Sequence, residues 1–290
     1  MDGILVIDKP EGYTSRDIVN IVGSLLNTKK VGHAGTLDPI ATGVLVVAVG
    51  SALKVLEFMN YNDKEYIAKV KFGIETNTLD ITGTPTKKED NYFVDSKKLN
   101  DVVKSFKGKY LQEVPLYSSV KVSGKRLYKY ARDNEEVELP KREVEIHSIE
   151  IEEINHDSFT FKTKVSKGTY IRSLIRDIGE KIGIPCTMES LRRTKQGPFS
   201  LDDSIKLSDI ENNNYKFLPI EKVLSNYLII EVDEQKENKI MNGIVLPNTY
   251  EKEIVVFKSK KTKNIIAIYQ KYDKDTSKIK PIKVIKSENE

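Results

Sequence analysis

The chain has 290 residues, of which 39% are hydrophobic and 31% charged, and its 16 glycines and 10 prolines are scattered along the length. This composition excludes collagen-like, low-complexity and wholly disordered chains, and the length favours one main domain with a smaller second one. The 47 basic residues exceed the 43 acidic residues only slightly, which gives a net charge of +4. That surplus permits a nucleic-acid partner but does not require one.

The sequence offers neither a metal-binding pattern nor an export signal. Cys186 is the single cysteine, so an intramolecular disulfide is impossible, and the three histidines form no cysteine and histidine set at zinc spacing. Residues 1–10 lack the charged start and apolar core of a signal peptide, and no apolar run approaches the roughly 18 residues of a membrane helix. We therefore expect no metal site and a cytoplasmic protein.

The first part of the chain mixes predicted strands and helices. Residues 3–7 form an apolar run that predicts a buried strand, and the segment 14–17, Thr-Ser-Arg-Asp, resembles a capping box at the start of a helix. Residues 44–49 predict a second buried strand. Residues 66–72 place apolar side chains at every second position, which is typical of a half-exposed strand.

The middle of the chain continues this irregular mixture. Residues 96–106 predict an amphipathic helix with the leading serine as its N-cap, and residues 144–151 and 159–165 predict two strands joined by a turn. Residues 170–182 carry apolar side chains at helical spacing, and a basic stretch follows at residues 191–195. The order of these elements favours an α+β fold with a mixed, mainly antiparallel sheet over a doubly wound fold.

The composition changes near the C-terminal end, where short β-rich runs separated by turn residues predict a small barrel-like module. We therefore expect a main domain over residues 1–225 and a second domain over residues 226–290. Residues 252–286 contain eleven lysines and three acidic residues, which gives this segment a net charge of +8. Two interpretations stay open for it, an RNA-binding surface and a merely solvated lysine-rich surface.

Residues 30–43 are the most unusual segment, with three glycines and a proline around His33 and Asp38. A loop with so many glycines has unusual backbone angles, and a loop that also places a histidine and an aspartate is a candidate site. An aspartate before proline is also a common turn-former, and a lone histidine can brace a loop through a hydrogen bond. The residues alone therefore leave a catalytic and a structural role open for Asp38.

The same loop carries a resemblance to a known family. Residues 32–39, GHAGTLDP, together with DKPEGYTS at residues 8–15, resemble the signature of the TruB family, the tRNA pseudouridine-55 synthases. Further blocks match in the family's order, at residues 64–66, 73–83, 114–121, 124–128, 166–174 and 191–194. The C-terminal part matches more weakly, and Asn242-Gly243 is the best sign of the family's PUA-like RNA-binding domain.

The resemblance implies both a fold and an activity. The implied fold is an α+β catalytic domain of the pseudouridine-synthase type followed by a small β-rich PUA-like domain. The implied activity is the isomerisation of uridine to pseudouridine at position 55 in the T-loop of tRNA, with the base flipped out and with neither cofactor nor metal. Asp38 matches the catalytic aspartate, which can act as nucleophile on the sugar or as base at C2′, and the sequence leaves both routes open.

Four further residues match substrate-binding positions of the family. The resemblance implies that Arg172 lies beside Asp38 and holds its carboxylate, and that Tyr66 stacks on the target uracil. Leu191 matches the apolar residue of the uracil pocket, and His33 matches a histidine that contacts the RNA loop. Without the resemblance, a surface arginine and two core residues would be the ordinary interpretations of Arg172, Tyr66 and Leu191.

The resemblance also implies the partner, which is the T-arm stem-loop of tRNA, bound by a monomer that requires no other protein. A tRNA-folding chaperone role is an additional expectation. Three rival hypotheses remain, a guide-RNA-dependent pseudouridine synthase, a non-catalytic RNA-binding chaperone and an N-glycoside hydrolase. The sequence lacks long basic extensions and keeps Asp38, which disfavours the first two. The hydrolase would release free uracil and leave an abasic site.

Overall fold

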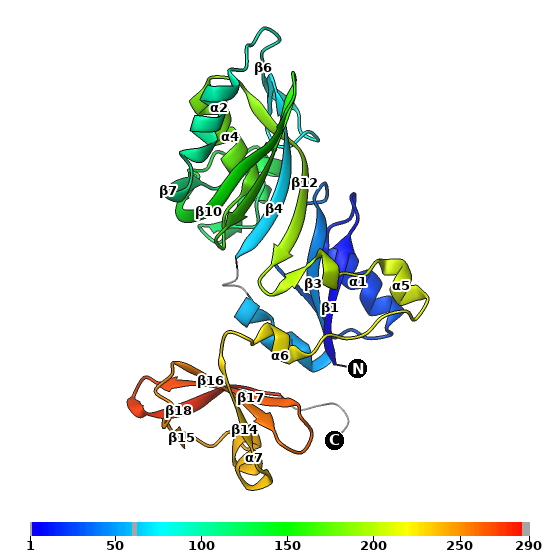
Figure 1. Ribbon diagram of the computed structural model, residues 1–290, viewed down its shortest axis with the longest axis vertical. Coiled ribbons are helices and arrows are strands. Elements are labelled where there is room, and N and C mark those ends of the chain that lie inside the picture. The colour runs from blue at the N-terminus through cyan, green and yellow to red at the C-terminus, as the bar shows by residue number, and fades with distance from the viewer. Residues whose placement is uncertain (1, 60–62, 286–290) are drawn as a thin grey trace.

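A nine-stranded sheet builds the larger part of the molecule, within residues 2–59 and 63–285 that the computed structural model describes (Figure 1). All neighbouring strands pair antiparallel except β3 and β12, which pair in parallel. The predicted α+β fold with a mixed, mainly antiparallel sheet is thereby confirmed. Seven strands form its main path, in the order β1 (Gly3–Lys9), β3 (Thr42–Val49), β12 (Cys186–Gln196), β4 (Lys64–Phe72), β11 (Ser158–Val165), β10 (Lys141–Ile154) and β7 (Gly108–Glu113). Two short strands lie off this path. Strand β2 (Val31–Ala34) pairs with β3, and β13 (Phe199–Ser200) pairs with β12.

The strands predicted from apolar and alternating runs are confirmed, because each of the five lies within β1, β3, β4, β10 or β11. In β4 the alternation is visible as burial, with Tyr66, Ala68, Val70 and Phe72 buried and the residues between them partly exposed. One side of this strand therefore faces the core and the other side is open to polar partners.

Strand β12 was not predicted, although it lies in the middle of the sheet. The sequence analysis described its residues 191–195 only as a basic stretch, yet they pair with β4 on one side and with β3 on the other. Arg193 is fully buried, and Arg192 Nη2 lies 2.8 Å from Asp8 Oδ2. Charged side chains are tolerated in this strand because they find partners inside the fold, which a hydrophobicity pattern cannot reveal.

The three longest α-helices share one apolar core with the sheet, namely α1 (Ser15–Leu25), α2 (Ser96–Lys104) and α4 (Ile171–Ile182). In Figure 1, α2 and α4 lie side by side on the sheet near β10. The capping box of α1 is confirmed, because Thr14 is the N-cap and Asp17 returns a hydrogen bond to its backbone.

The predicted cap of α2 was wrong. Asp95 is the N-cap, and its carboxylate accepts hydrogen bonds from two backbone N–H groups of the first turn, whereas Ser96 already lies in the helix. An aspartate in the extended conformation caps as well as a serine does, so the sequence offered two adjacent candidates. The helix also ends at Lys104 rather than at Phe106.

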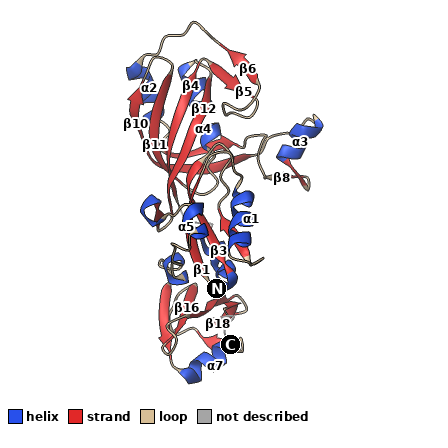
Figure 2. Cartoon of the chain, turned by 90° about the vertical axis from the view of Figure 1, so that its right-hand side faces the viewer, coloured by secondary structure: helices blue, strands red, loops and turns tan. Residues whose placement is uncertain are grey.

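Smaller elements surround the sheet. A hairpin of β5 (Ile74–Thr76) and β6 (Pro85–Lys88) extends one end, and the short strands β8 (Lys121–Val122) and β9 (Lys125–Arg126) lead into α3 (Leu127–Asp133). These last three elements form an arm that projects to one side of the molecule (Figure 2). The chain then reaches the second sheet through η2 (Leu201–Asp203), α5 (Leu207–Glu211) and α6 (Ile220–Val223).

The C-terminal module, residues 228–284, contains the second sheet. Within the described residues it has five strands in the order β14 (Leu228–Val232), β16 (Ile254–Ser259), β17 (Ile265–Tyr272), β18 (Asp275–Val284) and β15 (Leu246–Pro247). The predicted β-rich module is therefore confirmed, while helix α7 (Glu234–Met241) was not predicted.

The module packs against the 3-10 helix η1 (Gly50–Met59). Lys54 Nζ donates a hydrogen bond to the carbonyl of Val284 at 2.7 Å. Both parts contribute to one buried apolar cluster, which includes Ala52, Val55, Val256, Ile268 and Ile285. Among the described residues, none of the helices has the length and apolar character that crossing a membrane requires.

Candidate active site

A cleft of about 620 Å³ opens where the loop before β3 and the strands β4 and β12 meet the start of α4. Four of the five predicted site residues line it, namely Asp38, Tyr66, Arg172 and Leu191. They come from the loop between β2 and β3, from two neighbouring strands and from the first turn of a helix. The fold thus brings together residues that are far apart in the sequence.

Two side chains of the N-terminal segment, those of Ser15 and Lys9, hydrogen-bond to the loop that carries Asp38. Ser15 Oγ bonds to both backbone polar groups of Leu37, at 2.8 Å to its N–H and 3.2 Å to its carbonyl. The buried ammonium of Lys9 donates hydrogen bonds to three backbone carbonyls, those of Pro10, Tyr13 and Pro39. Burial lowers the pKa of Lys9 to about 8, although Asp38 opposes this shift.

The carboxylate of Asp38 is gripped by Arg172 in a two-point contact. Arg172 Nε lies 2.9 Å from Asp38 Oδ2, and Arg172 Nη2 lies 3.3 Å from Asp38 Oδ1. The guanidinium also donates to the carbonyls of Thr78 at 2.8 Å and Tyr117 at 3.0 Å. The side chain of Arg172 is 5% exposed and that of Asp38 is 35% exposed. The arginine is therefore fixed inside the protein while the carboxylate remains accessible from the cleft.

Tyr66 and Leu191 form the apolar wall of the cleft. They lie on the adjacent strands β4 and β12, where Leu191 pairs with Ala68 and Arg193 pairs with Tyr66. Both side chains are largely buried, with 6% and 7% of their surface exposed. A planar ring beside an aliphatic side chain suits the flat, partly apolar face of a base.

Arg193 supports this wall from inside the sheet. Its Nε donates to the carbonyl of Val44 at 2.7 Å and its Nη2 to the carbonyl of Gly35 at 3.0 Å. Burial lowers the pKa of Arg193, and the neighbouring Tyr66 opposes that shift. Gly43, with φ +96°, allows β3 to pass this strand, because a Cβ there would lie 2.3 Å from the carbonyl oxygen of Arg193.

Several cationic side chains also line the cleft, among them Lys64, Arg132 and Lys167. Burial lowers the pKa of Lys64 to about 8, and the charges of Arg193 and Lys167 act in the same direction. Arg132 lies in α3 of the projecting arm, where its guanidinium stacks over the ring of Tyr128 at 5.4 Å. These residues give the rim a positive charge, which favours an anionic ligand.

His33 is the predicted site residue that is not among the residues lining the cleft. It lies on β2, paired with Val47 of β3. Burial lowers the pKa of His33, and the charges of Arg193 and Arg16 lower it further. Its contact with RNA therefore stays a prediction.

Lys9, Lys64 and Arg193 contribute to this site but were not predicted from the sequence. Lys9 and Lys64 stand within the matching blocks, but a lysine in a motif gave no sign of its burial. Arg193 also stands in a matching block, at residues 191–194, but its stretch was identified only as basic. Within the described part of the chain, no group of three or more His, Cys, Asp or Glu side chains could hold a metal ion.

Comparison with known proteins shows the family of this chain. A profile of the TruB family pseudouridylate synthase N-terminal domain matches residues 24–171, and one of the tRNA pseudouridylate synthase B C-terminal domain matches residues 172–233. The chain belongs to the TruB family. Its relatives include the tRNA pseudouridine synthase B of Clostridium tetani, with 41% identity over 93% of this chain and 92% of that protein. That of Oceanobacillus iheyensis is 41% identical over 100% of this chain and 99% of its own length.

Solved structures share the fold of this TruB family member over nearly its whole length. The crystal structure of a Cbf5-Nop10-Gar1 complex matches with a TM-score of 0.74 and 27% identity, covering 98% of this chain and 84% of the matched chain. The archaeal box H/ACA sRNP Nop10-Cbf5 complex matches with a TM-score of 0.73 and 25% identity, over 99% and 87% of the two chains. The chain is therefore a pseudouridylate synthase with the α+β fold and β-rich C-terminal module expected from its sequence.

Proposed function

We propose that this enzyme converts uridine to pseudouridine at position 55 in the T-loop of tRNA, with Asp38 as the catalytic carboxylate. The observation that carries the proposal is the two-point contact between Asp38 and the buried Arg172 at the floor of the cleft. Relatives that align over the full length bear the name tRNA pseudouridine synthase B, which supports tRNA as the substrate.

The isomerisation breaks the N1–C1′ bond, turns the uracil and forms a C5–C1′ bond, while C5 loses a proton and N1 gains one. The atoms balance without an oxidant, a reductant or a group donor. Asp38 can attack C1′ as a nucleophile or remove a proton from C2′, and both routes need an ionised carboxylate directed at the sugar. Arg172 supplies that direction, because its other donors are fixed on the carbonyls of Thr78 and Tyr117.

The cleft fits a base that has left the RNA stack. A duplex or folded loop hides the C5 atom and the glycosidic bond, so the nucleotide must be extruded before the reaction. In our proposal Tyr66 stacks on the extruded uracil, and Leu191 beside it lines the apolar part of the uracil pocket. The volume of about 620 Å³ lies within the usual range for small-molecule sites.

The remaining contacts are proposed to recognise the RNA. Lys64, Arg132 and Lys167 at the rim of the cleft face the phosphates, and His33 contacts the RNA loop. We further propose that the T-arm stem-loop is sufficient and that residues 226–290 form a PUA-like RNA-binding domain beside a catalytic domain of residues 1–225. The enzyme acts as a cytoplasmic monomer without an obligatory protein partner, and it also assists tRNA folding.

One experiment tests the activity and its independence from other molecules. The purified protein is incubated with unmodified tRNA that was folded beforehand, in the presence of a chelator and without guide RNA or cofactor. Carbodiimide-blocked primer extension should then show one new stop at position 55 of the tRNA. An absence of modification that guide RNA reverses would favour a guide-dependent enzyme, and release of free uracil would identify a hydrolase.

A further inference from the structure

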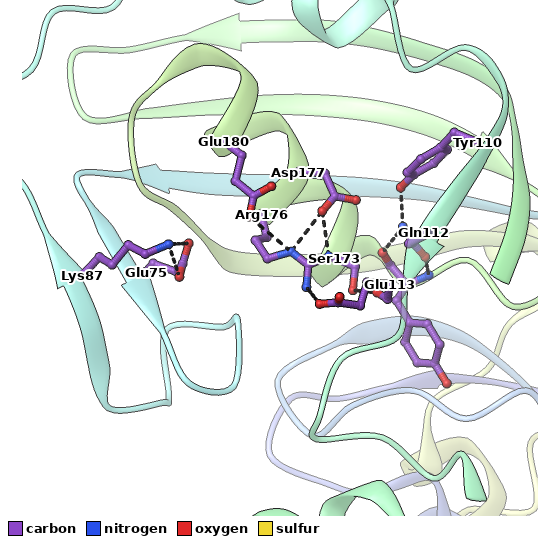
Figure 3. Close-up of polar contacts among 10 residues, drawn as sticks. Glu75, Lys87, Tyr110, Gln112, Glu113, Ser173, Arg176, Asp177 and Glu180 are labelled. Atoms are coloured by element: carbon purple, nitrogen blue, oxygen red, sulfur yellow. Dashed lines mark hydrogen bonds and ion pairs between the residues drawn. The ribbon is translucent and has the colours of Figure 1, made fainter. Parts of the chain in front are cut away.

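Gln112 is a buried amide at the end of β7, behind the cleft and outside the residues that line it. Its side chain is part of a polar network that joins β7 to α4 (Figure 3). Oε1 accepts a hydrogen bond from the backbone N–H of Tyr170 at 2.8 Å, and Nε2 donates to the carbonyl of the same residue at 3.1 Å. Nε2 also donates to the hydroxyl of Tyr110. Every hydrogen-bonding group of the amide except one lone pair is thereby used.

Tyr170 is the residue at which α4 begins. It is the N-cap, but its side chain makes no capping hydrogen bond to the helix. Its carbonyl accepts the first helical hydrogen bond, from Leu174 N–H at 3.0 Å. The start of α4 is therefore fixed from outside by Gln112, which grips both polar groups of the residue where the chain turns into the helix.

Two further contacts join the same pair of elements. Ser173 Oγ donates to the carbonyl of Glu113 at 2.8 Å, and Arg176 Nη1 lies 3.1 Å from the carboxylate of Glu113. Figure 3 shows both of these contacts beside Gln112, along one side of the helix. The first two turns of α4 are thus tied to two consecutive residues of β7, and the buried Gln112 makes the contact nearest the helix start.

The position of this helix start determines where Arg172 lies. Arg172 follows Tyr170 by two residues, and its guanidinium must reach Asp38, the carbonyl of Thr78 and the carbonyl of Tyr117 together. An α-helix advances about 1.5 Å and turns about 100° per residue, so a small slide or rotation of α4 would break this geometry. The chain after β7 also supplies Tyr117, so the same segment anchors the helix and provides one of the acceptors.

We propose that Gln112 is a positioning residue for catalysis, which holds the start of α4 so that Arg172 keeps Asp38 in the reactive orientation. The inference rests on the proposed roles of Asp38 and Arg172. It predicts that a change at Gln112 lowers turnover through a displaced Arg172 while tRNA binding, which depends on other surfaces, is retained.

The first test removes the hydrogen bonds and keeps the approximate volume. For Gln112→Leu we expect kcat on tRNA to fall by about tenfold or more, as displacements near 1 Å in an active site do, with Kd for tRNA changed by less than about twofold. Lys109→Gln is the matched control, because Lys109 lies on the same strand but its ammonium pairs with the exposed Glu143. The control should retain the wild-type kcat.

The second test uses a substitution whose hydrogen bonding depends on pH. In Gln112→Glu an ionised carboxylate can accept from Tyr170 N–H but cannot donate to the Tyr170 carbonyl, whereas the protonated acid can do both. Since burial disfavours the ionised form, this carboxyl should titrate above the ordinary range of a glutamate. We therefore expect the kcat of this variant, relative to wild type, to rise reversibly as the pH is lowered from about 8.5 to 5.5.

Charged and titratable groups around the amide must be considered in reading that profile. They come from β7, β10 and α4 and comprise Tyr110, Glu113, Arg142, Arg176 and Asp177. Burial raises the pKa of Asp177 and of Tyr110. These groups are present in wild type and in both variants, so only a pH dependence confined to Gln112→Glu belongs to the introduced carboxyl.

The outcomes separate this inference from the function on which it rests. An inactive wild-type protein would contradict the proposed function. An active wild type together with a fully active Gln112→Leu variant would contradict only the role of Gln112. If Gln112→Leu loses its thermal transition or its tRNA binding, the role of Gln112 is tested by the pH profile of kcat for Gln112→Glu instead. A profile parallel to wild type at all pH values overturns the inference, and a reversible gain of kcat at low pH supports it.

Discussion

Arg172 and Lys261 are both cations paired with a carboxylate, but they lie in very different surroundings. The side chain of Arg172 is 5% exposed and its guanidinium also contacts two carbonyls besides Asp38. Lys261 is 73% exposed, and its ammonium lies 3.4 Å from Glu234, which is 72% exposed. An exposed pair contributes about 0–1 kcal/mol, while breaking a buried pair costs about 3–5 kcal/mol.

Ion pairs like that of Lys261 occur along the lysine-rich segment of the C-terminal module. Many of its lysines are paired with acids, several of which precede the segment, so its net charge of +8 overstates the free positive surface. The pairs with preceding acids include Lys258 with Glu221, Lys261 with Glu234, Lys263 with Glu231 and Lys283 with Glu57. Charge that is counted along a sequence and charge that is available to a ligand are therefore different quantities.

The largest expected effect is a loss of turnover when the pair of Asp38 and Arg172 is changed. Asp38→Asn keeps the size of the side chain and removes the charge, so turnover should fall to background while tRNA affinity changes by less than about threefold. Turnover can be followed by the release of tritium from tRNA labelled at C5 of uridine. Asp157→Asn is the control, because this carboxylate is 51% exposed and pairs with Lys71 on the surface. Equal losses of binding and turnover in Asp38→Asn would contradict a catalytic role.

The substitution Arg172→Lys tests whether a positive charge beside Asp38 is enough for turnover. A lysine ammonium cannot reach Asp38, the Thr78 carbonyl and the Tyr117 carbonyl in the planar geometry of the guanidinium. We expect kcat to fall by about 10- to 100-fold with the thermal midpoint lowered by a few degrees. Single-turnover kinetics with excess enzyme would measure the chemical step directly. Wild-type turnover in this variant would show that only the charge matters.

Lys64 is partly exposed at the cleft, between the buried Arg172 and the exposed lysines of the C-terminal module, and its protonation can be tested by varying the pH. Its pKa is lowered to about 8, so it is cationic below that pH and neutral above it. If the cation binds phosphate, tRNA affinity should weaken as the pH rises past about 8, and Lys64→Gln should abolish this dependence. One such contact corresponds to about three- to tenfold in Kd. A filter-binding titration from pH 6.5 to 9.5 that gives the same slope for both proteins would exclude Lys64 as a contact.

The smallest effects are expected in the C-terminal module. Lys252, Lys260 and Lys274 are exposed, and within the described residues their ammonium groups form no ion pair. Replacing all three by alanine should lower the slope of log affinity against log salt by up to about one unit per lost phosphate contact. Alanine at Lys261, Lys263 and Lys271 is the matched control, because each of these lysines has an acidic partner. Unchanged slopes in both triple variants would favour a merely solvated surface.

Deleting the module would be a poorer test of the same idea. Its Val256, Ile268 and Ile285 belong to the apolar cluster that also contains Ala52 and Val55 of η1. Removing residues from 226 onward would expose that cluster, so a loss of tRNA binding could follow from damaged packing. Surface substitutions avoid this problem because they leave the shared core intact.

Five strands of the main sheet and its longest helices could be predicted because their apolar side chains repeat with the period of the element, as in β4 and α1. Strand β12 could not be predicted in this way, because its second half contains Arg192, Arg193 and Lys195. Arg193 is stabilised there by carbonyls of Val44 and Gly35, which come from distant parts of the chain. A local pattern cannot contain such partners, so the strand was described only as a basic stretch.

The candidate site followed the same rule. Asp38, Tyr66, Arg172 and Leu191 could be singled out because they stand in motifs that resemble a known family, and the structure places all four around one cleft. The supporting residues Lys9 and Gln112 could not be singled out, since their roles depend on which backbone groups lie beside them. Motifs predict the residues that face the ligand better than those that hold them in place.

The place of β12 in the sheet has a consequence for biosynthesis. Strands β3 and β4 are neighbours along the chain, but each pairs with β12 and not with the other, so the sheet stays open until residues 186–196 have left the ribosome. Ile285 completes the apolar cluster around η1 only after the strands of the C-terminal module have been synthesised. Such high contact order slows folding, and the nascent chain carries unpaired strand edges meanwhile. The enzyme should therefore acquire its active site only after residues 186–196 have been synthesised.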